Sequence, residues 1–123
     1  MIVMKRVYDP PEKGDGVRVL VDRLWPRGLS RDKAAVDHWI REIAPEAELR
    51  RWYGHREERW EEFRARYRAE LDGKEEMVRQ ILNLARGRRV TLLYAAHNPE
   101  HNNARVLLEY LREKSPEEVQ MPA

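Results

Sequence analysis

The stretch VLVDRLWPRG, residues 19–28, joins an apolar run to a polar turn. Its first three residues are the consecutive apolar residues of a strand that is buried on both faces. Residues 22–28 instead combine a carboxylate, two arginines and an indole with a proline and a glycine, which favour a turn. This change predicts a buried strand that ends at a polar surface, a combination that suits a ligand site better than a core.

The rest of the chain repeats the alternation of apolar strands and amphipathic helices. Strands are predicted at about residues 2–8, 17–24 and 90–96, with about five helices between and after them. This order indicates an α/β fold with a small, mostly parallel sheet. We expect one compact domain over residues 1–114 and a flexible tail over residues 115–123. The first connection is short enough to be either a wide hairpin or a crossover without a helix.

Two of the predicted helices bear on the site. Ser30 is an N-cap residue type, and the apolar residues after it have the spacing of one buried helix face: Val36, Trp39, Ile40 and Ile43. The pair Asn98-Pro99 predicts the start of the last helix, which continues to about Lys114. An anion is favoured at such a helix start.

Ligands of open parallel sheets bind at the carboxyl ends of the strands. Two polar loops are predicted there, residues 22–28 and the stretch YAAHNPEHNN, residues 94–103. Their candidate ligand-binding residues are Arg23, Trp25, Arg27, Tyr94, Asn98, Glu100 and Asn102. The predicted function is therefore binding of an anionic, phosphate- or nucleotide-like small molecule at this edge of the sheet.

Each candidate has a predicted role at this edge. Arg23 and Arg27 supply bidentate donors for the anion, and Trp25 or Tyr94 stacks on a planar ring. The catalytic candidates are Asp22 and His101, with Asp22 orienting a histidine that moves a proton near neutral pH.

Structural roles are open for the same residues. Asp22 and Arg23 can pair with neighbours and seal the end of a strand, and Trp25 can pack in the core. Whether the protein is an enzyme is not indicated by the sequence.

Composition narrows the class of protein. The 123 residues carry 24 basic and 22 acidic side chains and a net charge of +2, which is balance rather than the clustered positive charge of a nucleic-acid footprint. Cysteine is absent, so disulfides and thiol catalysis are excluded. No apolar stretch approaches the roughly 20 residues that span a bilayer. We expect a cytoplasmic protein without a membrane partner.

One motif resembles a zinc site. Residues 97–101, HNPEH, match the H-x-x-E-H pattern of some metalloproteases. That chemistry needs both histidines on one face of a continuous helix, whereas Asn98-Pro99 predicts that the helix starts after His97. The expectation is therefore that no metal binds here, and the sequence identifies no cofactor.

Arginine-rich segments leave two alternatives open. The predicted helix from about Arg56 to Leu71 interleaves arginines with glutamates, a pattern typical of a solvated face, and residues 49–55 combine cations with aromatics. The latter segment is either a lid over the sheet edge or a packed corner. Arg50, Arg51 and the following helix would serve a nucleic-acid-binding accessory module. A protein-interaction domain without a ligand is the third possibility, and the oligomeric state is not indicated.

The blocks VDRLWPRG and TLLYAA…HNNA resemble the YeaO-like family of uncharacterised bacterial proteins, DUF 488, over about Ile2 to Leu111. The resemblance implies a compact Rossmann-like α/β domain and no known reaction. Related, more distant families keep an Asp-Arg or Asp-x-Arg motif after one strand and a polar cluster after another, which is similar to the placement of Asp22, Arg23, Glu100 and His101.

Overall fold

The computed structural model describes residues 1–122. Its centre is a four-stranded, wholly parallel sheet with the order β1-β4-β2-β3. The strands are β1 Ile2–Arg6, β2 Val17–Leu20, β3 His38–Trp39 and β4 Val90–Tyr94. The α/β class predicted from the sequence is confirmed, as is a single compact domain.

The first connection is a crossover without an α-helix. β4 lies between β1 and β2, because Val90 pairs with Ile2 on one side and with Val17 on the other. The chain reaches β2 through a 3-10 turn at Lys13–Asp15. Gly16 closes this turn at φ 67°, and a Cβ there would lie 2.3 Å from the Arg89 carbonyl oxygen. The position therefore requires glycine.

The strands are shorter than the apolar runs that predict them. The run over residues 17–24 forms a strand only to Leu20, after which Val21 N–H still donates to the Leu93 carbonyl at 3.1 Å. The next link between the strand ends is made by a side chain, because Ala95 N–H donates to Asp22 Oδ2 at 3.0 Å. The hydrogen-bond ladder between β2 and β4 ends at Asp22, because its carboxylate accepts in place of a backbone carbonyl.

The helix predicted after Ser30 is wrong beyond its first turn. Ser30 caps α1, Arg31–Ala34, by accepting from Lys33 N–H, but Ala35 turns left-handed at φ 49°. The chain then forms β3 and a 3-10 turn at Arg41–Ile43. The apolar spacing arises instead from β3, which pairs with β2, and from the 3-10 turn that follows β3.

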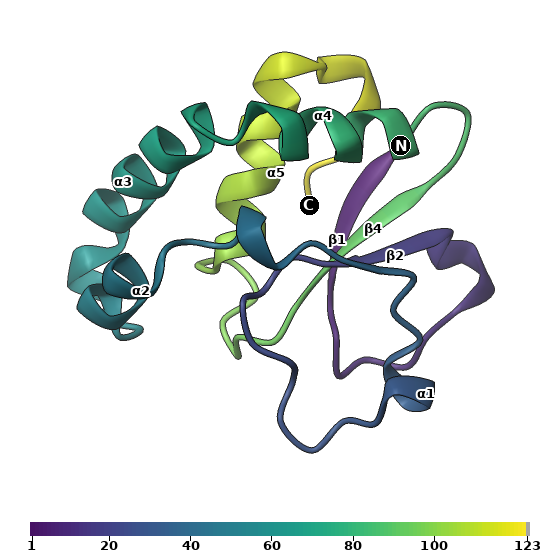
Figure 1. Ribbon diagram of the computed structural model, residues 1–123, viewed down its shortest axis with the longest axis horizontal. Helices are drawn as coiled ribbons and strands as arrows, with labels where there is room; N and C mark the ends of the chain where they lie inside the picture. The colour runs from purple at the N-terminus through teal and green to yellow at the C-terminus, as the bar shows by residue number, and fades with distance from the viewer. Residues whose placement is uncertain (123) are drawn as a thin grey trace.

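Four longer helices follow, α2 Ala47–Tyr53, α3 Trp60–Asp72, α4 Glu75–Leu84 and α5 Asn103–Lys114. Figure 1 shows α4 and α5 on one side of the strands and α1 on the other. The last helix begins later than predicted: Asn102 is the N-cap of α5 and accepts from Arg105 N–H at 2.8 Å. Asn98 instead caps the preceding turn.

Alternate residues of the central strands bury opposite faces of the sheet. Val19 and Leu92 belong to the larger apolar cluster, which includes α2 to α5. Leu20 and Leu93 belong to a smaller cluster with Trp39. The strands are thus covered on both faces, as their continuous apolar runs predict.

The segment after α5 lies along the sheet. Val119 forms a parallel bridge with Ile2 at the outer edge of β1, and Gln120 N–H donates to the Ile2 carbonyl at 3.0 Å. Val119 and Gln120 thus have defined partners, and the flexibility predicted for residues 115–123 stays a prediction, with Ala123 outside the described residues. Over residues 1–122, none of the helices has the length and apolarity to cross a membrane.

Candidate functional site

A cavity of about 870 Å³ opens at the carboxyl ends of the strands. Its walls come from the segments after β1, β2 and β4 and from the connection between α2 and α3. The two loops that the sequence places at this edge, residues 22–28 and 94–103, therefore lie at one cavity. The volume is within the range of sites for small organic ligands, roughly 300–1,000 Å³.

Asp22 lines this cavity from the end of β2. Its Oδ2 accepts from Ala95 N–H and its Oδ1 accepts from Asn103 Nδ2, each at 3.0 Å. Burial raises the pKa of Asp22, and the hydrogen bonds from Asn103 and Ala95 and the charge of Arg50 offset this only in part. The carboxylate joins β2, β4 and α5 and forms no salt bridge within residues 1–122.

Arg23 is bound to the protein backbone. Its guanidinium donates to the carbonyls of Ala44 at 3.1 Å and Pro45 at 3.3 Å, and Glu42 and Glu46 lie 3.5 Å from it. It lines the cavity, but these contacts occupy most of its donors. Arg23 anchors the chain before α2, which is the structural role left open by the sequence.

Trp25 packs in the smaller apolar cluster. Its ring meets Trp39 edge-on with centroids 5.3 Å apart, and its Nε1–H donates to the Leu29 carbonyl at 2.6 Å. The Arg31 guanidinium covers the ring at 4.5 Å. One side of the indole still borders the cavity, so its main role is to hold residues 22–29 against the sheet.

Arg27 and Arg50 are the cations with free donors at the cavity. Both side chains are exposed, and neither forms a salt bridge with any residue from 1 to 122. The backbone of Arg27 is fixed because the Tyr8 hydroxyl donates to its carbonyl at 2.8 Å. Arg50 comes from α2, in the segment for which the sequence leaves a lid or a packed corner open.

Residues 49–55 lie partly at the cavity and partly away from it. Arg50, Tyr53 and His55 line the cavity. Trp52 faces elsewhere, with the guanidinium of Arg66 4.5 Å from its ring. His55 has a left-handed backbone at φ 58°, directly after the helix-ending Gly54. One part of the segment is thus cavity wall and the other is packed corner.

His101 is paired with Glu57 and not with Asp22. Its Nδ1 contacts Glu57 Oε2, and its ring stacks on Trp60 with centroids 4.5 Å apart. Glu57 also accepts from Asn98 Nδ2 at 3.1 Å. The predicted orientation of His101 by Asp22 is therefore wrong, because the α2–α3 connection supplies a nearer carboxylate.

The remaining candidates from the second loop are structural. Tyr94 is only 4% exposed, packs in the larger apolar cluster and is not among the cavity-lining residues, and burial raises its pKa. Glu100 is exposed outside the cavity lining. Asn98 and Asn102 border the cavity, but their amides are used locally: Asn98 accepts from His101 N–H, and Asn102 donates to the Asn98 carbonyl.

The HNPEH motif lacks the geometry of a zinc site. Both histidines precede α5, so they do not share a helix face. His97 Nδ1 lies 3.2 Å from Arg6 Nη2, whereas His101 contacts Glu57. Within residues 1–122, histidines and carboxylates form no cluster of three that could hold a metal ion.

Sequence reasoning missed two partners, Asn103 and Glu57. Both lie far along the chain from the residues they bind, Asp22 and His101 respectively. The Asn98–Asn103 stretch offered a weak signal for Asn103, because its amide groups exceed what one helix cap uses. No local pattern distinguishes Glu57 from the other glutamates of its segment.

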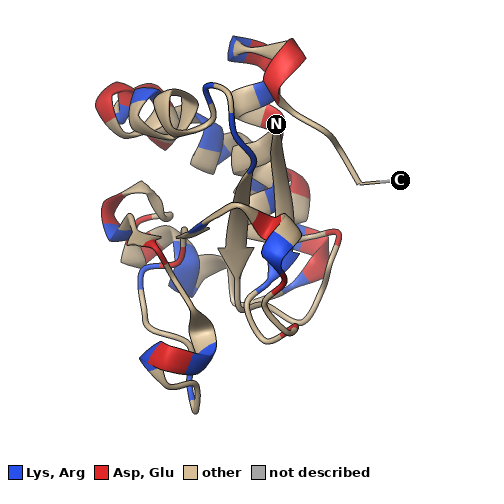
Figure 2. Ribbon diagram, turned by 90° about the vertical axis from the view of Figure 1, so that its right-hand side faces the viewer, with Lys and Arg blue, Asp and Glu red and all other residues tan. Residues whose placement is uncertain are grey.

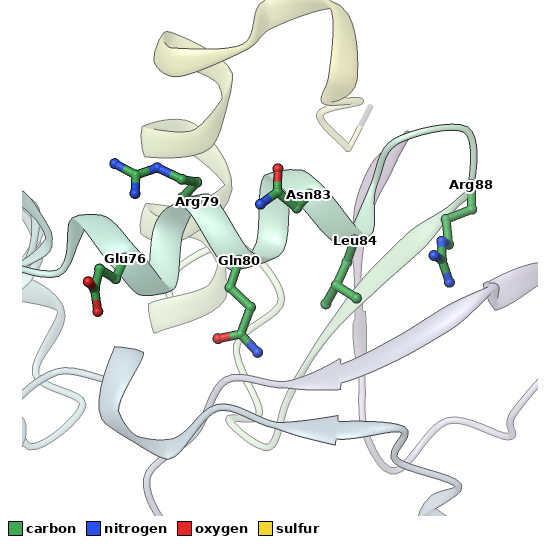
Figure 3. A pocket seen from close by; sticks show the side chains of 6 residues that line it. All are labelled: Glu76, Arg79, Gln80, Asn83, Leu84 and Arg88. Carbon is green, nitrogen blue, oxygen red and sulfur yellow. The ribbon is translucent and has the colours of Figure 1, made fainter.

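A second hollow of about 350 Å³ lies along α4. Its lining residues are Glu76, Arg79, Gln80, Asn83, Leu84 and Arg88. Figure 3 shows Arg79 and Asn83 on the upper side of the helix, Glu76, Gln80 and Leu84 on its lower side, and Arg88 on the turn after it, so the polar groups do not point to a common centre. This surface offers no convergent chemistry.

The arginines of α3 are paired with carboxylates. Arg64 binds Glu109 at 2.7 Å, Arg66 binds Glu62 at 2.5 Å, and Arg68 contacts Glu113. Figure 2 shows both signs of charge along the helical ribbons. The α3 surface is therefore a mixed-charge helix face.

Comparison with known proteins gives consistent relatives. A family model described as "Inactive DUF488-N3 subclade" matches residues 1–122. The chain is 44% identical to the uncharacterised protein YeaO of Escherichia coli K12 over 111 residues, 90% of this chain and 96% of that protein. It is 39% identical over 106 residues to an uncharacterised protein of Mycobacterium tuberculosis H37Rv, with 86% of this chain and 89% of that protein covered. No solved structure matches the chain. This chain therefore belongs to the YeaO-like DUF488 family, within the subclade described as inactive.

Proposed function

We propose that the protein binds an anionic small molecule, phosphate- or nucleotide-like, in the cavity at the carboxyl edge of the sheet. The observation that carries this proposal is the pair Arg27 and Arg50, two exposed guanidinium groups that border the cavity and form no salt bridge within residues 1–122. Guanidinium donors suit the bidentate recognition of phosphate and carboxylate groups.

Two arginines of the lining without a carboxylate partner favour an anion. Arg23 is paired with Glu42 and Glu46, whereas Arg27 and Arg50 border the cavity and form no salt bridge within residues 1–122. The arginines of α3, in contrast, have their charge matched by nearby glutamates. This difference favours the cavity over α3 as the anion site, and it makes a nucleic-acid-binding module the weaker alternative.

Binding without turnover agrees best with the site. Asp22 and His101 do not contact one another, since His101 is held by Glu57, so the proton relay predicted from the sequence is not assembled. The family description "inactive" points the same way. We therefore infer a binding protein, with the cytoplasm as the compartment expected from the sequence.

Isothermal titration calorimetry with ribose 5-phosphate and adenosine monophosphate tests the proposal. Arg27→Ala and Arg50→Ala should each weaken binding of the responding probe by about tenfold or more, because each removes a charge-assisted hydrogen bond. Arg112→Ala is the matched control, since Arg112 is exposed on α5 outside the cavity. Unchanged affinity in both cavity variants, or no binding of either probe to the parent protein, would contradict the proposal.

A further inference from the structure

We propose that the ligand is a hydroxyl-bearing organic phosphate of the sugar-phosphate class and that Asp22 accepts a hydrogen bond from one of its hydroxyl groups. This inference rests on the proposed function and names the chemistry of the same cavity. It assigns Asp22 to ligand recognition rather than to proton transfer.

Asp22 has acceptor positions that the protein does not use. An ionised carboxylate offers about four acceptor positions on its two oxygens. Within residues 1–122, Asp22 receives one hydrogen bond on each oxygen, from Ala95 N–H and from Asn103 Nδ2. These two bonds hold the carboxylate in place at the cavity wall and leave acceptor positions for a donor in the cavity.

Keeping the Asp22 carboxylate away from water costs free energy. A carboxylate that is largely withdrawn from water is unfavourable unless it is paired or hydrogen-bonded. Asp22 has no salt-bridge partner within the described chain, although Arg23 follows it directly and binds the Ala44 and Pro45 carbonyls instead. A ligand donor would add to the two hydrogen bonds that Asp22 receives from Ala95 N–H and Asn103 Nδ2, at the acceptor positions which these bonds leave unused.

The volume and the lining of the cavity suit an organic molecule. A cavity of about 870 Å³ is far larger than an inorganic anion needs. Beside its cations it is lined by carbon-rich groups, among them Tyr53, Phe63, Pro45 and Ala96. An organic phosphate can place its anionic group on Arg27 or Arg50 and its carbon skeleton against these groups.

The charge of the cavity lining favours a hydroxyl over a cationic amine as the donor. Arg50 already acts on Asp22 through its charge, and neither Arg50 nor Arg27 has a salt-bridge partner within residues 1–122. A second positive charge in the cavity would be repelled by these guanidinium groups. A neutral hydroxyl donates to Asp22 without this penalty.

The test compares two probes on the same proteins at about pH 8, far above the usual carboxyl pKa of about 4. Ribose 5-phosphate carries an anion and hydroxyl groups, and methyl phosphate carries the anion alone. On the parent protein, ribose 5-phosphate should bind at least about tenfold more tightly. In Asp22→Asn its affinity should fall by about tenfold, while that of methyl phosphate should rise, because a negative charge has been removed.

Opposite signs for the two probes separate recognition from a folding defect, which would weaken both. Glu57→Gln is the matched control: it neutralises a cavity carboxylate that is bound to His101, so both affinities should move in the same direction. If the parent protein binds the two probes within about threefold of each other, the role of Asp22 is wrong and anion binding stands. If neither probe binds, the proposed function itself fails. The comparison of the two probes on the parent protein tests the role of Asp22 even if Asp22→Asn does not fold.

Discussion

Asp15 and Asp22 lie at opposite ends of β2 and meet different partners. Asp15, before the strand, binds Arg18 at 2.5 Å and Lys5 at 3.1 Å, and Glu12 N–H donates to it at 3.0 Å. Asp22, after the strand, receives hydrogen bonds from Asn103 and Ala95 and has no salt-bridge partner within residues 1–122. One carboxylate is neutralised within the fold, and the other is positioned but not neutralised.

The pKa values of the two groups shift in opposite directions. For Asp15, burial opposes ionisation, but hydrogen bonds from Glu12 N–H, Lys5 and Arg18 outweigh it and lower the pKa. For Asp22, burial dominates and raises the pKa. The carboxylate at the amino edge of the sheet is therefore stabilised in its ionised form by the fold, whereas burial makes the carboxylate at the carboxyl edge harder to ionise.

The largest expected effect is at Asp15. Asp15→Ala leaves the buried Arg18 without its carboxylate and should lower the free energy of unfolding by about 3–5 kcal/mol, measured by urea denaturation. Glu61→Ala removes an exposed pair with Arg64 and should cost less than about 1 kcal/mol. Similar losses for the two variants would break the comparison by showing that the Asp15 network does not hold the fold.

The pH dependence of stability should differ in sign between the two aspartates. Asp22 has a raised pKa, so on acidification the folded protein takes up this proton before the unfolded chain does, and stability rises relative to Asp22→Asn. Asp15 has a lowered pKa, so its contribution is present above the usual carboxyl pKa of about 4 and is lost as the pH falls further. Urea unfolding of the parent, Asp22→Asn and Asp15→Asn between about pH 7 and pH 3 measures both slopes. Slopes of equal sign would refute the distinction.

The smallest effect is expected at Glu57. The side chain is exposed and pairs with His101, so Glu57→Gln should change the free energy of unfolding by less than about 1 kcal/mol. Urea denaturation of this variant and of Asp15→Ala compares the exposed Glu57–His101 pair with the buried Asp15 network. A loss of several kcal/mol would mean that the Glu57–His101 pair contributes to the free energy of unfolding as strongly as a buried ion pair does.

The sheet was predictable because its signals are local. Continuous apolar runs mark β1, β2 and β4, and their parallel arrangement places residues 22–28 and 94–103 at one edge. The helix predicted through Trp39 failed for the same reason, since apolar spacing alone does not distinguish a helix from a short strand followed by a turn. Pairing of Ile40 N–H with the Leu20 carbonyl, a tertiary contact, decided the outcome.

The partners of the site residues were less accessible to sequence reasoning. Asp22 was placed correctly at the strand end, but its donor Asn103 comes from α5, 81 positions along the chain. Arg23 looked like an anion ligand from its residue type, whereas nearby backbone carbonyls take its donors. Residue type predicts what a group can bind, and only the folded chain determines which partner reaches it first.

The bridge between Val119 and Ile2 has a consequence for self-association. An uncovered outer strand presents a row of unpaired N–H and C=O groups, which is a template for edge-to-edge aggregation. Here the C-terminal segment covers part of the β1 edge, and the opposite edge is β3, a strand of only 2 residues. Both margins of the sheet are therefore poor templates for a foreign strand, which protects a domain whose sheet is open rather than closed into a barrel.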